Sequence, residues 1–474
     1  MDMCEYIEAA TSQIRARRAR DMVARELTAH MEDQAAYYRE RGMSEAEAER
    51  EAVRQMGDPV EVGISMDRIH RPQTDWKMII MLAFLCVLGL CLQTAFNREV
   101  LRAQLLQAGA PVVLDLFSGV PRILLFVLPV ALILGVLVCV MDYTVVLRHV
   151  TWFICLVLFI LWMEALVIWG EFSGPVLFQM NWYYLLVPLY ASLLYRYRGR
   201  GIRGFAGGIF LLVMLQAVMG FQMGMGILSM TSFAGLRFSL VLAVMLSAAV
   251  MCGWYGERKK GRMICLWGGA LLAFCMAALW MLLRGGFRSE RIRAILHPYD
   301  YANSGGYYVV MVRGWLGRCT LWGNPEAAAQ YAQYYVGAYF TDGSFAAGNG
   351  NILYLFLRYG IVPGIIVCLI FLGCIGYFLY RCLRQKNQLG RVTGTGCCMV
   401  FLVEFVGYLM SNLGVLPCYA KLPFLSYNGI DIGVWAVLMG IVFSIIRYQN
   451  LLPAEHKGTA PRYRYRIKIE KVAL

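Results

Sequence analysis

Over the first 72 residues, apolar side chains recur at the spacing of an α-helix within an otherwise polar sequence. This stripe predicts a helix over residues 11–41. Its apolar members are Ile14, Met22, Leu27, Met31 and Tyr38. Ser44 and Glu47 have the spacing of a capping box, which predicts a second helix over residues 45–56. We therefore expect residues 1–72 to form a small helical domain in the cytosol.

The pattern changes at residue 77, where the first of ten apolar stretches begins. Each is long enough, or nearly long enough, to cross a bilayer as a helix. They cover residues 77–96, 122–141, 150–169, 175–195, 205–228, 236–255, 264–283, 352–380, 396–416 and 430–446. The pattern therefore predicts an all-α polytopic membrane protein whose ten-helix body spans residues 77–447. A large loop over residues 284–351 separates the seventh and eighth stretches, and a basic tail follows over residues 448–474.

Composition agrees with this class and excludes several others. Hydrophobic residues make up 59% of the 474 residues and charged residues 16%, whereas globular proteins average about 45–50% and 25%. A soluble enzyme, a disordered chain, a collagen-like fibre and a nucleic-acid-binding domain with a membrane tail are thereby excluded. Most of the 15 cysteines lie inside apolar runs, where cysteine acts as a small hydrophobic residue, and their spacing indicates no metal site.

Basic residues gather in alternate connections between the apolar stretches. Because cytoplasmic loops carry an excess of Lys and Arg, these connections predict the cytoplasmic face. Their basic residues are Arg148, Arg196, Arg198, Arg200, Arg203, Arg258, Lys259, Lys260, Arg262, Arg381, Arg384, Lys386 and Arg391. With ten spans, both termini then lie in the cytoplasm, and the basic tail faces an anionic leaflet.

The large loop is also basic, although this orientation places it outside. Clustered arginines on the outer face suggest an anionic ligand near the membrane surface, and a scatter of solvated charges is the alternative. These arginines are Arg288, Arg291, Arg293, Arg313 and Arg318.

Two carboxylates, Glu164 and Glu404, lie inside apolar stretches. A charge at the centre of a membrane helix costs on the order of 2.5–3.5 kcal/mol. Each carboxylate is therefore expected either to have a functional role or to be protonated and hydrogen-bonded within the bundle.

Four segments, in order along the chain, resemble the SEDS family (shape, elongation, division and sporulation), the FtsW/RodA/SpoVE group. They are "LFQMNWYYLLVPLYASLLYRYR" at residues 177–198, "RSERIRAILHPYDYANSGGYYVVMVRGWLGRCTLWG" at 288–323, "YGIVPGIIVCLIFL" at 359–372 and "SNLGVLPCYAKLPFLSYNGID" at 411–431. The last resembles the family's Leu-Pro-Phe-x-Ser-Tyr-Gly-Gly-Ser-Ser motif. Residues 24–63 separately resemble the prefix domain found ahead of some bacterial permeases.

The resemblance implies a peptidoglycan glycosyltransferase in the bacterial plasma membrane. Such an enzyme would polymerise the lipid-linked precursor lipid II on the outer face, in cell shape, division or sporulation. The resemblance also implies a class B penicillin-binding protein as partner, and no nucleic acid. Two other functions stay open: a catalytically inactive relative that binds the precursor or such a partner, and a flippase of lipid-linked precursors.

Glycan transfer from an undecaprenyl-pyrophosphate donor needs a base for the attacking hydroxyl, and positive charge or a divalent cation for the departing pyrophosphate. The family's essential aspartate lies in a His-Thr-Asp-x-x-Phe-Ala string, and "FTDGSFA" makes Asp342 its match. A gapless count back from Gly360 gives Asn349 instead, and Asp342 in Thr-Asp-Gly also suits a simple turn. The expected substrate-binding residues are Arg291, Arg293, Arg313, Arg318, Ser426 and Tyr427.

This sequence departs from the family pattern in two motifs. In the first segment, Met180, Asn181 and Trp182 stand in place of Pro, Ser and Glu, and Leu185 stands in place of a lysine. In the last segment, Asp431 replaces a serine, and we expect it to be a helix cap or an interface residue.

Overall fold

The computed structural model describes residues 1–15, 17–70, 72, 74–108, 128–144, 149–155, 159, 181–222, 233–284, 287–339, 351–417, 420–423 and 429–449. All regular secondary structure within these ranges is helical. This confirms the all-α class.

Four helices lie in the first 72 residues, the region predicted as a prefix domain and called by that name below: α1 (Met3–Ser12), α2 (Arg17–Glu40), α3 (Glu45–Gln55) and α4 (Pro59–His70). The predicted second helix is confirmed as α3. Its capping box is present, with the Ser44 backbone N–H donating to Glu47 Oε2 at 3.3 Å, and the Ser44 hydroxyl donates to the same oxygen at 2.7 Å. Residues of α1, α2 and α3 bury one shared core.

The predicted helix over residues 11–41 is wrong at its start, because the chain breaks between α1 and α2. The break is stabilised by a contact distant in sequence: the Arg15 backbone N–H donates to Asp67 Oδ1 of α4 at 2.9 Å. α4 itself lies close to α1, since a Cβ built on Gly63 would come within 2.3 Å of Ala10 O. A stripe within one segment does not contain this information.

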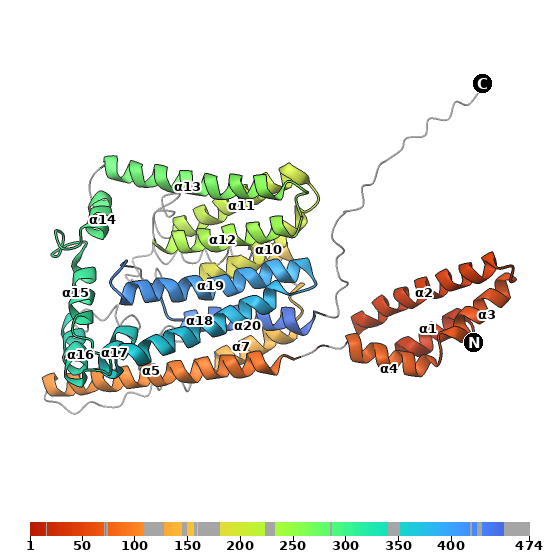
Figure 1. Ribbon diagram of the computed structural model, residues 1–474, viewed down its shortest axis with the longest axis horizontal. Coiled ribbons are helices and arrows are strands. Elements are labelled where there is room, and N and C mark those ends of the chain that lie inside the picture. Colours follow the sequence, from red (N-terminus) through yellow and green to blue (C-terminus); the bar gives the residue numbers. More distant parts are fainter. Residues whose placement is uncertain are drawn as a thin grey trace, which may run out of the picture.

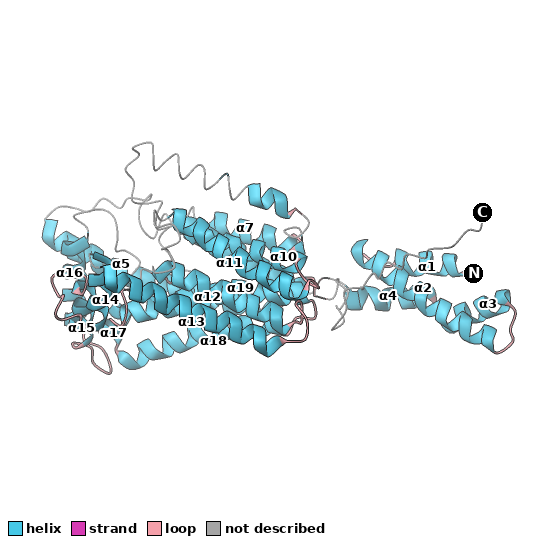
Figure 2. Ribbon diagram, turned by 90° about the horizontal axis from the view of Figure 1, so that it is seen from above, coloured by secondary structure: helices cyan, strands magenta, loops and turns pink. Residues whose placement is uncertain are grey.

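The membrane body is a bundle of long helices (Figures 1 and 2). They are α5 (Trp76–Ala108), α7 (Leu128–Val140), α10 (Leu186–Arg196) preceded by the 3-10 turn η3 (Asn181–Leu185), α11 (Gly201–Gln222), α12 (Phe233–Met251), α13 (Lys259–Arg284), α18 (Ile361–Leu383), α19 (Gln388–Asn412) and α20 (Gly429–Arg447). Five are long and apolar enough to cross a membrane, within residues 76–96, 201–219, 233–251, 361–383 and 388–412. The chain is thus a multi-pass membrane protein. The count of ten spans stays a prediction, because the second to fifth predicted spans lie partly outside the described residues.

α19 is the central helix of the bundle and packs against α10, α12, α18 and α20. It begins at Gln388, eight residues before the predicted start at residue 396. The first turns of α19 contain polar residues and are nevertheless buried, because their threonine hydroxyls donate to backbone carbonyls of the same helix. Thr393 Oγ1, for example, donates to Leu389 O at 2.8 Å. Their glycines admit close neighbours: a Cβ on Gly396 would come within 2.4 Å of Met245 Sδ.

The predicted span over residues 352–380 is two helices, α17 (Asn351–Tyr359) and α18. Gly360 separates them with φ +105°, a conformation that favours glycine. A Cβ there would come within 2.3 Å of Leu321 O, and the Ile361 N–H donates to Thr320 O at 3.0 Å. The large loop therefore crosses over the first turn of α18 and ends the longer helix that the apolar pattern predicted.

The large loop is itself a helical layer, formed by α14 (Phe287–Leu296), α15 (Tyr307–Leu316), α16 (Pro325–Tyr339) and α17. This outer layer lies at one end of the bundle (Figure 1). α5 continues to Ala108, twelve residues past the predicted end of the first span. There Phe96 packs against Tyr331 and Tyr354 in a second core.

The basic connections meet at the opposite end of the bundle. The Gly199 N–H donates to Trp254 O at 2.7 Å, Trp254 Nε1 donates to Gln388 Oε1, and Arg381 Nη2 lies 2.7 Å from Asp75 Oδ2. The described basic connections therefore lie together at one end of the bundle, as the alternation along the chain predicts. Which end faces the cytoplasm stays a prediction.

Candidate functional site

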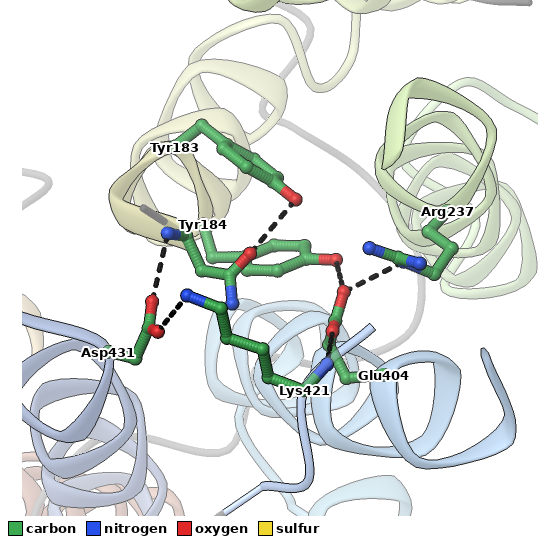
Figure 3. Close-up of polar contacts among 7 residues, drawn as sticks. Tyr183, Tyr184, Arg237, Glu404, Lys421 and Asp431 are labelled. Carbon is green, nitrogen blue, oxygen red and sulfur yellow. Dashed lines mark hydrogen bonds and ion pairs between the residues drawn. The ribbon is translucent and has the colours of Figure 1, made fainter. Parts of the chain in front are cut away.

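Four charged residues gather inside the membrane body, on α12, on α19, in the first turn of α20 and on the connection between α19 and α20 (Figure 3). Glu404 and Asp431 have no exposed surface. Arg237 lies beside the first carboxylate and Lys421 beside the second. We call these four residues the charge cluster. Its two acids and two bases leave it formally neutral, as a buried group of charges in a low-dielectric site requires.

Glu404, on α19, is held from three directions. Arg237 Nε of α12 lies 2.8 Å from Oε1, and the Tyr184 hydroxyl of η3 donates to the same oxygen. The backbone N–H of Lys421 donates to Oε2 at 3.2 Å. Arg237 reaches this position because α19 carries a glycine at 407, where a Cβ would come within 3.1 Å of Arg237 Cδ. The carboxylate thus has partners from α12, from η3 and from the connection that follows α19.

Asp431, in the first turn of α20, is held by two donors. The Lys421 ammonium binds Oδ2, and the Asn181 backbone N–H donates to Oδ1 at 3.1 Å. The prediction of a helix cap or interface residue did not include the cationic partner that the structure gives this carboxylate.

The connection between α19 and α20 is re-entrant. α19 ends at Asn412, yet Lys421 contacts Glu404, which lies eight residues, or about 12 Å, back along the helix. Ala420 and Leu422 on either side are buried. Non-helical backbone at this depth is tolerated where protein surrounds it or where it lines a wet cavity. The cluster supplies hydrogen-bond partners for such a segment.

The turn η3 completes one wall of the cluster with aromatic side chains. Tyr183 and Tyr184 pack on Phe238 of α12, and Tyr184 also packs on Trp435 of α20. The Tyr183 hydroxyl donates to Asn181 Oδ1 at 3.3 Å. This turn is the segment in which the family motif would place a glutamate and a lysine. Here Trp182 and Leu185 stand there, and the charges come from α12, α19, α20 and the re-entrant connection.

A separate set of contacts, which we call the junction, joins the outer layer to the end of α19. Arg313 Nε of α15 donates to Gly414 O at 2.9 Å, and Ser411 Oγ donates to the Tyr308 hydroxyl at 3.0 Å. Asn412 Oδ1 accepts the Leu353 backbone N–H at 3.2 Å. The glycine at 414 has φ +60°, and a Cβ there would come within 3.0 Å of Arg313 Cγ.

The predicted site residues do not all come together. Glu404 is in the charge cluster and Arg313 is in the junction, whereas Arg293 on α14 is exposed. Arg318 is exposed too, lies over the Trp315 ring and donates to Gln330 Oε1 at 3.1 Å. The remaining predicted positions lie outside the described residues, in side chain or entirely: Arg288, Arg291, Asp342, Asn349, Ser426, Tyr427 and Glu164.

Sequence reasoning missed Arg237 and Lys421. Arg237 is the lone charge in the apolar run "FAGLRFSLVLAV", which is the same signal that singled out Glu404. Lys421 looks like an ordinary loop lysine, because only the fold shows that its loop re-enters the bundle. The described residues contain no group of three His, Cys, Asp or Glu side chains that could hold a metal ion. A divalent cation at the pyrophosphate stays a prediction.

The fold and this site define a polytopic α-helical membrane protein with an outer helical layer and an internal charge cluster. A family model described as "Cell cycle protein", for the FtsW/RodA/SpoVE group, matches residues 236–451. The match includes the outer layer, α18, α19, α20 and all four residues of the charge cluster. The matched region, slightly under half of the chain, is thus similar to the SEDS family.

Two solved structures are similar to this chain. One is a chain from a peptidoglycan synthase complex, described as coordinating polymerization and crosslinking. It has 16% sequence identity and a TM-score of 0.54, and the match covers 79% of this chain and 98% of that chain. The other is the rod shape determining protein RodA of Thermus thermophilus, as a single-residue variant. Its identity is 15%, its TM-score 0.46 and the coverage 79% and 97%. No curated protein sequence matches the chain significantly.

Proposed function

We propose that this chain is a peptidoglycan glycosyltransferase that polymerises lipid II at the outer face of the bacterial plasma membrane. The observation that carries the proposal is the extent of the family match, residues 236–451. This one stretch contains the outer layer, the "FTDGSFA" string with Asp342, and the connection with Ser426 and Tyr427. Every segment to which the chemistry is assigned therefore lies within the matched region.

In this proposal Asp342 accepts the proton of the attacking sugar hydroxyl, as a carboxylate base can. Arg313 contributes to holding the departing pyrophosphate. Its Nε–H donates to Gly414 O, but a guanidinium has five N–H donors, and the remaining four can bind phosphate oxygens. The contact with Gly414 fixes the arginine at the mouth of the bundle, where the outer layer meets α19.

Orientation is part of the proposal. The basic connections lie at one end of the bundle and the outer layer at the other, so the positive-inside rule supports an external outer layer. A reporter fused after Arg391 is expected to be cytoplasmic, and one inserted near Gly323 external. The opposite pair of results would contradict both the orientation and an outer site.

The expected partner is a class B penicillin-binding protein. The likeness to a chain from a peptidoglycan synthase complex supports this, since polymerization and crosslinking are coordinated in that assembly. The test is polymerisation of lipid II by the purified protein in liposomes, with and without a co-purified partner. Glycan strands are expected, more of them with the partner. No strands under either condition, with lipid II bound, would contradict the proposal.

A catalytically inactive, precursor-binding relative is the second candidate. Trp182 and Leu185 favour it, because they occupy positions where the family motif has a carboxylate and a lysine. A flippase gains less support: a carboxylate that cycles protons across the membrane must change partners, and Glu404 is held by Arg237, Tyr184 and a backbone N–H. In the same assay, the inactive relative binds lipid II and forms no strands.

A further inference from the structure

The charge cluster has one member that differs from the others in its exposure and in the segment that carries it. Glu404, Asp431 and Arg237 lie on helices, and at most 9% of each side chain is exposed. Lys421 lies on the re-entrant connection, and 20% of its side chain is exposed. Its backbone is fixed, because its N–H donates to Glu404. Among the four residues, only Lys421 therefore combines a backbone held by a hydrogen bond with a side chain that is partly exposed and accessible to another anion.

The surroundings of Lys421 provide a further hydrogen-bond donor. Asn181 is 6% exposed, and its backbone N–H binds the same Asp431 carboxylate as the Lys421 ammonium. Within the described residues, its side-chain Nδ2 has no acceptor. A buried amide N–H without an acceptor is costly. An anionic oxygen between this amide and the ammonium would satisfy both donors.

We propose that the re-entrant connection is a binding element for a phosphate-bearing lipid, with Lys421 and the Asn181 amide as donors. Asp431 is the counter-ion that Lys421 leaves when the ligand binds. The proposal rests on the proposed function, which makes the ligand the pyrophosphate of an undecaprenyl-linked substrate. It extends that function by assigning two donors to the substrate that no motif singles out, on the connection that continues to Ser426 and Tyr427.

Binding of this kind is an exchange of ion pairs and not the burial of a new charge. Lys421 passes from a carboxylate to a phosphate, and both are anions of similar hydrogen-bonding capacity. The carboxylate that it leaves keeps the Asn181 backbone N–H, 3.1 Å from Oδ1, in the first turn of α20. Negative charge is favourable at a helix N-terminus. The exchange therefore leaves Asp431 with stabilising partners.

The test is titration of farnesyl pyrophosphate into the purified full-length protein in neutral phosphatidylcholine nanodiscs, with farnesol as the uncharged match. Lys421→Met keeps the length of the side chain and is expected to weaken pyrophosphate binding about tenfold or more. Lys421→Arg is expected to retain it. Asp431→Asn removes the competing carboxylate and is expected to tighten it. Lys386→Met, an exposed lysine at the other end of the bundle, is the matched control and should bind as the wild type does.

The opposite signs expected for Lys421→Met and Asp431→Asn separate binding from structure. If the pair only supported the fold, both variants would lose thermal stability and binding together, and that result would overturn the proposal. Unchanged binding by Lys421→Met would overturn it as well. Where Lys421→Met does not fold, the double variant Lys421→Met/Asp431→Asn leaves no unpaired charge, and it must still bind weakly.

The outcome is separable from that of the proposed function. Binding that depends on Lys421 without any polymerisation of lipid II contradicts the enzyme and supports the binding element. Polymerisation by the wild type, together with pyrophosphate binding that is unchanged in Lys421→Met, contradicts only the binding element.

Discussion

The prefix domain and the membrane body both carry ion pairs, but they place them in opposite environments. In the prefix domain the pair of Arg39 and Glu45 lies on the surface, with 48% and 78% of the side chains exposed. In the membrane body the pair of Arg237 and Glu404 has 9% and 0%. An exposed pair contributes about 0–1 kcal/mol, and a buried pair that loses one partner costs about 3–5 kcal/mol.

This difference separates charges that water solvates from charges that the fold itself must pair. The first 76 residues hold 11 basic and 16 acidic residues, and water solvates most of them without help from the fold. A charge inside the bundle must instead be matched by a partner from another helix. The four residues of the charge cluster therefore constrain how α12, α19 and α20 assemble, whereas the surface charges of the prefix domain do not constrain its helices in this way.

The largest effect is expected from removing one member of the buried pair. Glu404→Leu removes the carboxylate that pairs with the buried Arg237 guanidinium and should lower the free energy of unfolding by about 3–5 kcal/mol. Thermal unfolding of the purified protein in detergent measures the loss. The double variant Glu404→Leu/Arg237→Leu removes both charges and is expected to recover most of the stability. A single variant as stable as the wild type would show that the two charges do not depend on each other.

A smaller effect is expected from closing the space that Arg237 uses. Gly407→Leu places a side chain where Arg237 and Ala420 already lie, and overfilling a packed site costs about 1–3 kcal/mol. Gly373→Leu on α18 is the control, because nothing lies within 4 Å of a Cβ there. Equal losses of stability in the two variants would mean that the space beside Arg237 is not specifically required.

A change at the helix cap of the prefix domain should have a smaller effect still. Ser44→Ala in the fragment of residues 1–71 removes the hydroxyl bond to Glu47, and cap substitutions cost about 0.5–1 kcal/mol. Urea unfolding followed by circular dichroism measures it. A loss as large as that of Glu404→Leu in the body would contradict the contrast between the two regions.

The pH dependence of the same fragment gives the smallest expected effect. The Ser44 hydroxyl and backbone N–H lower the pKa of Glu47 below its ordinary value. The folded state thus favours the carboxylate, so this stabilisation is present above the unfolded pKa of about 4.3 and is lost as pH falls through the folded pKa. Ser44→Ala is expected to flatten the fall in stability over this range. An unchanged pH profile would mean that the capping box does not hold the carboxylate.

The parts of the fold that were predictable from the sequence rest on local patterns. The apolar stretches gave the membrane class, and Ser44 with Glu47 gave the start of α3. The break before α2 was not predictable, because it depends on Asp67 of α4. The division at Gly360 was not predictable either, because it depends on a loop that crosses the helix from residues 320–323. In both places a contact distant in sequence overrides a continuous local pattern.

The candidate site was predictable to a similar degree. Glu404 and Arg237 each stand alone in an apolar run, so the sequence contains a signal for both. Lys421 lies within the connection between α19 and α20, and Asp431 lies in the first turn of α20, so that they look like an ordinary loop residue and an ordinary cap residue. Their pairing follows only from the position of the described residues 420–423, which brings Lys421 back to the level of Glu404.

The proposal that this chain polymerises lipid II is tested most directly by Asp342→Asn in the polymerisation assay with the partner present. The change keeps the size of the side chain and removes the base, so turnover is expected to fall by about 10²–10⁴ while lipid II still binds. Gel separation of the glycan strands measures turnover. Wild-type polymerisation with an undiminished Asp342→Asn variant would contradict the assignment of the base. Absence of strands in the wild type would contradict the enzyme itself and would favour the alignment that places Asn349 at the catalytic position.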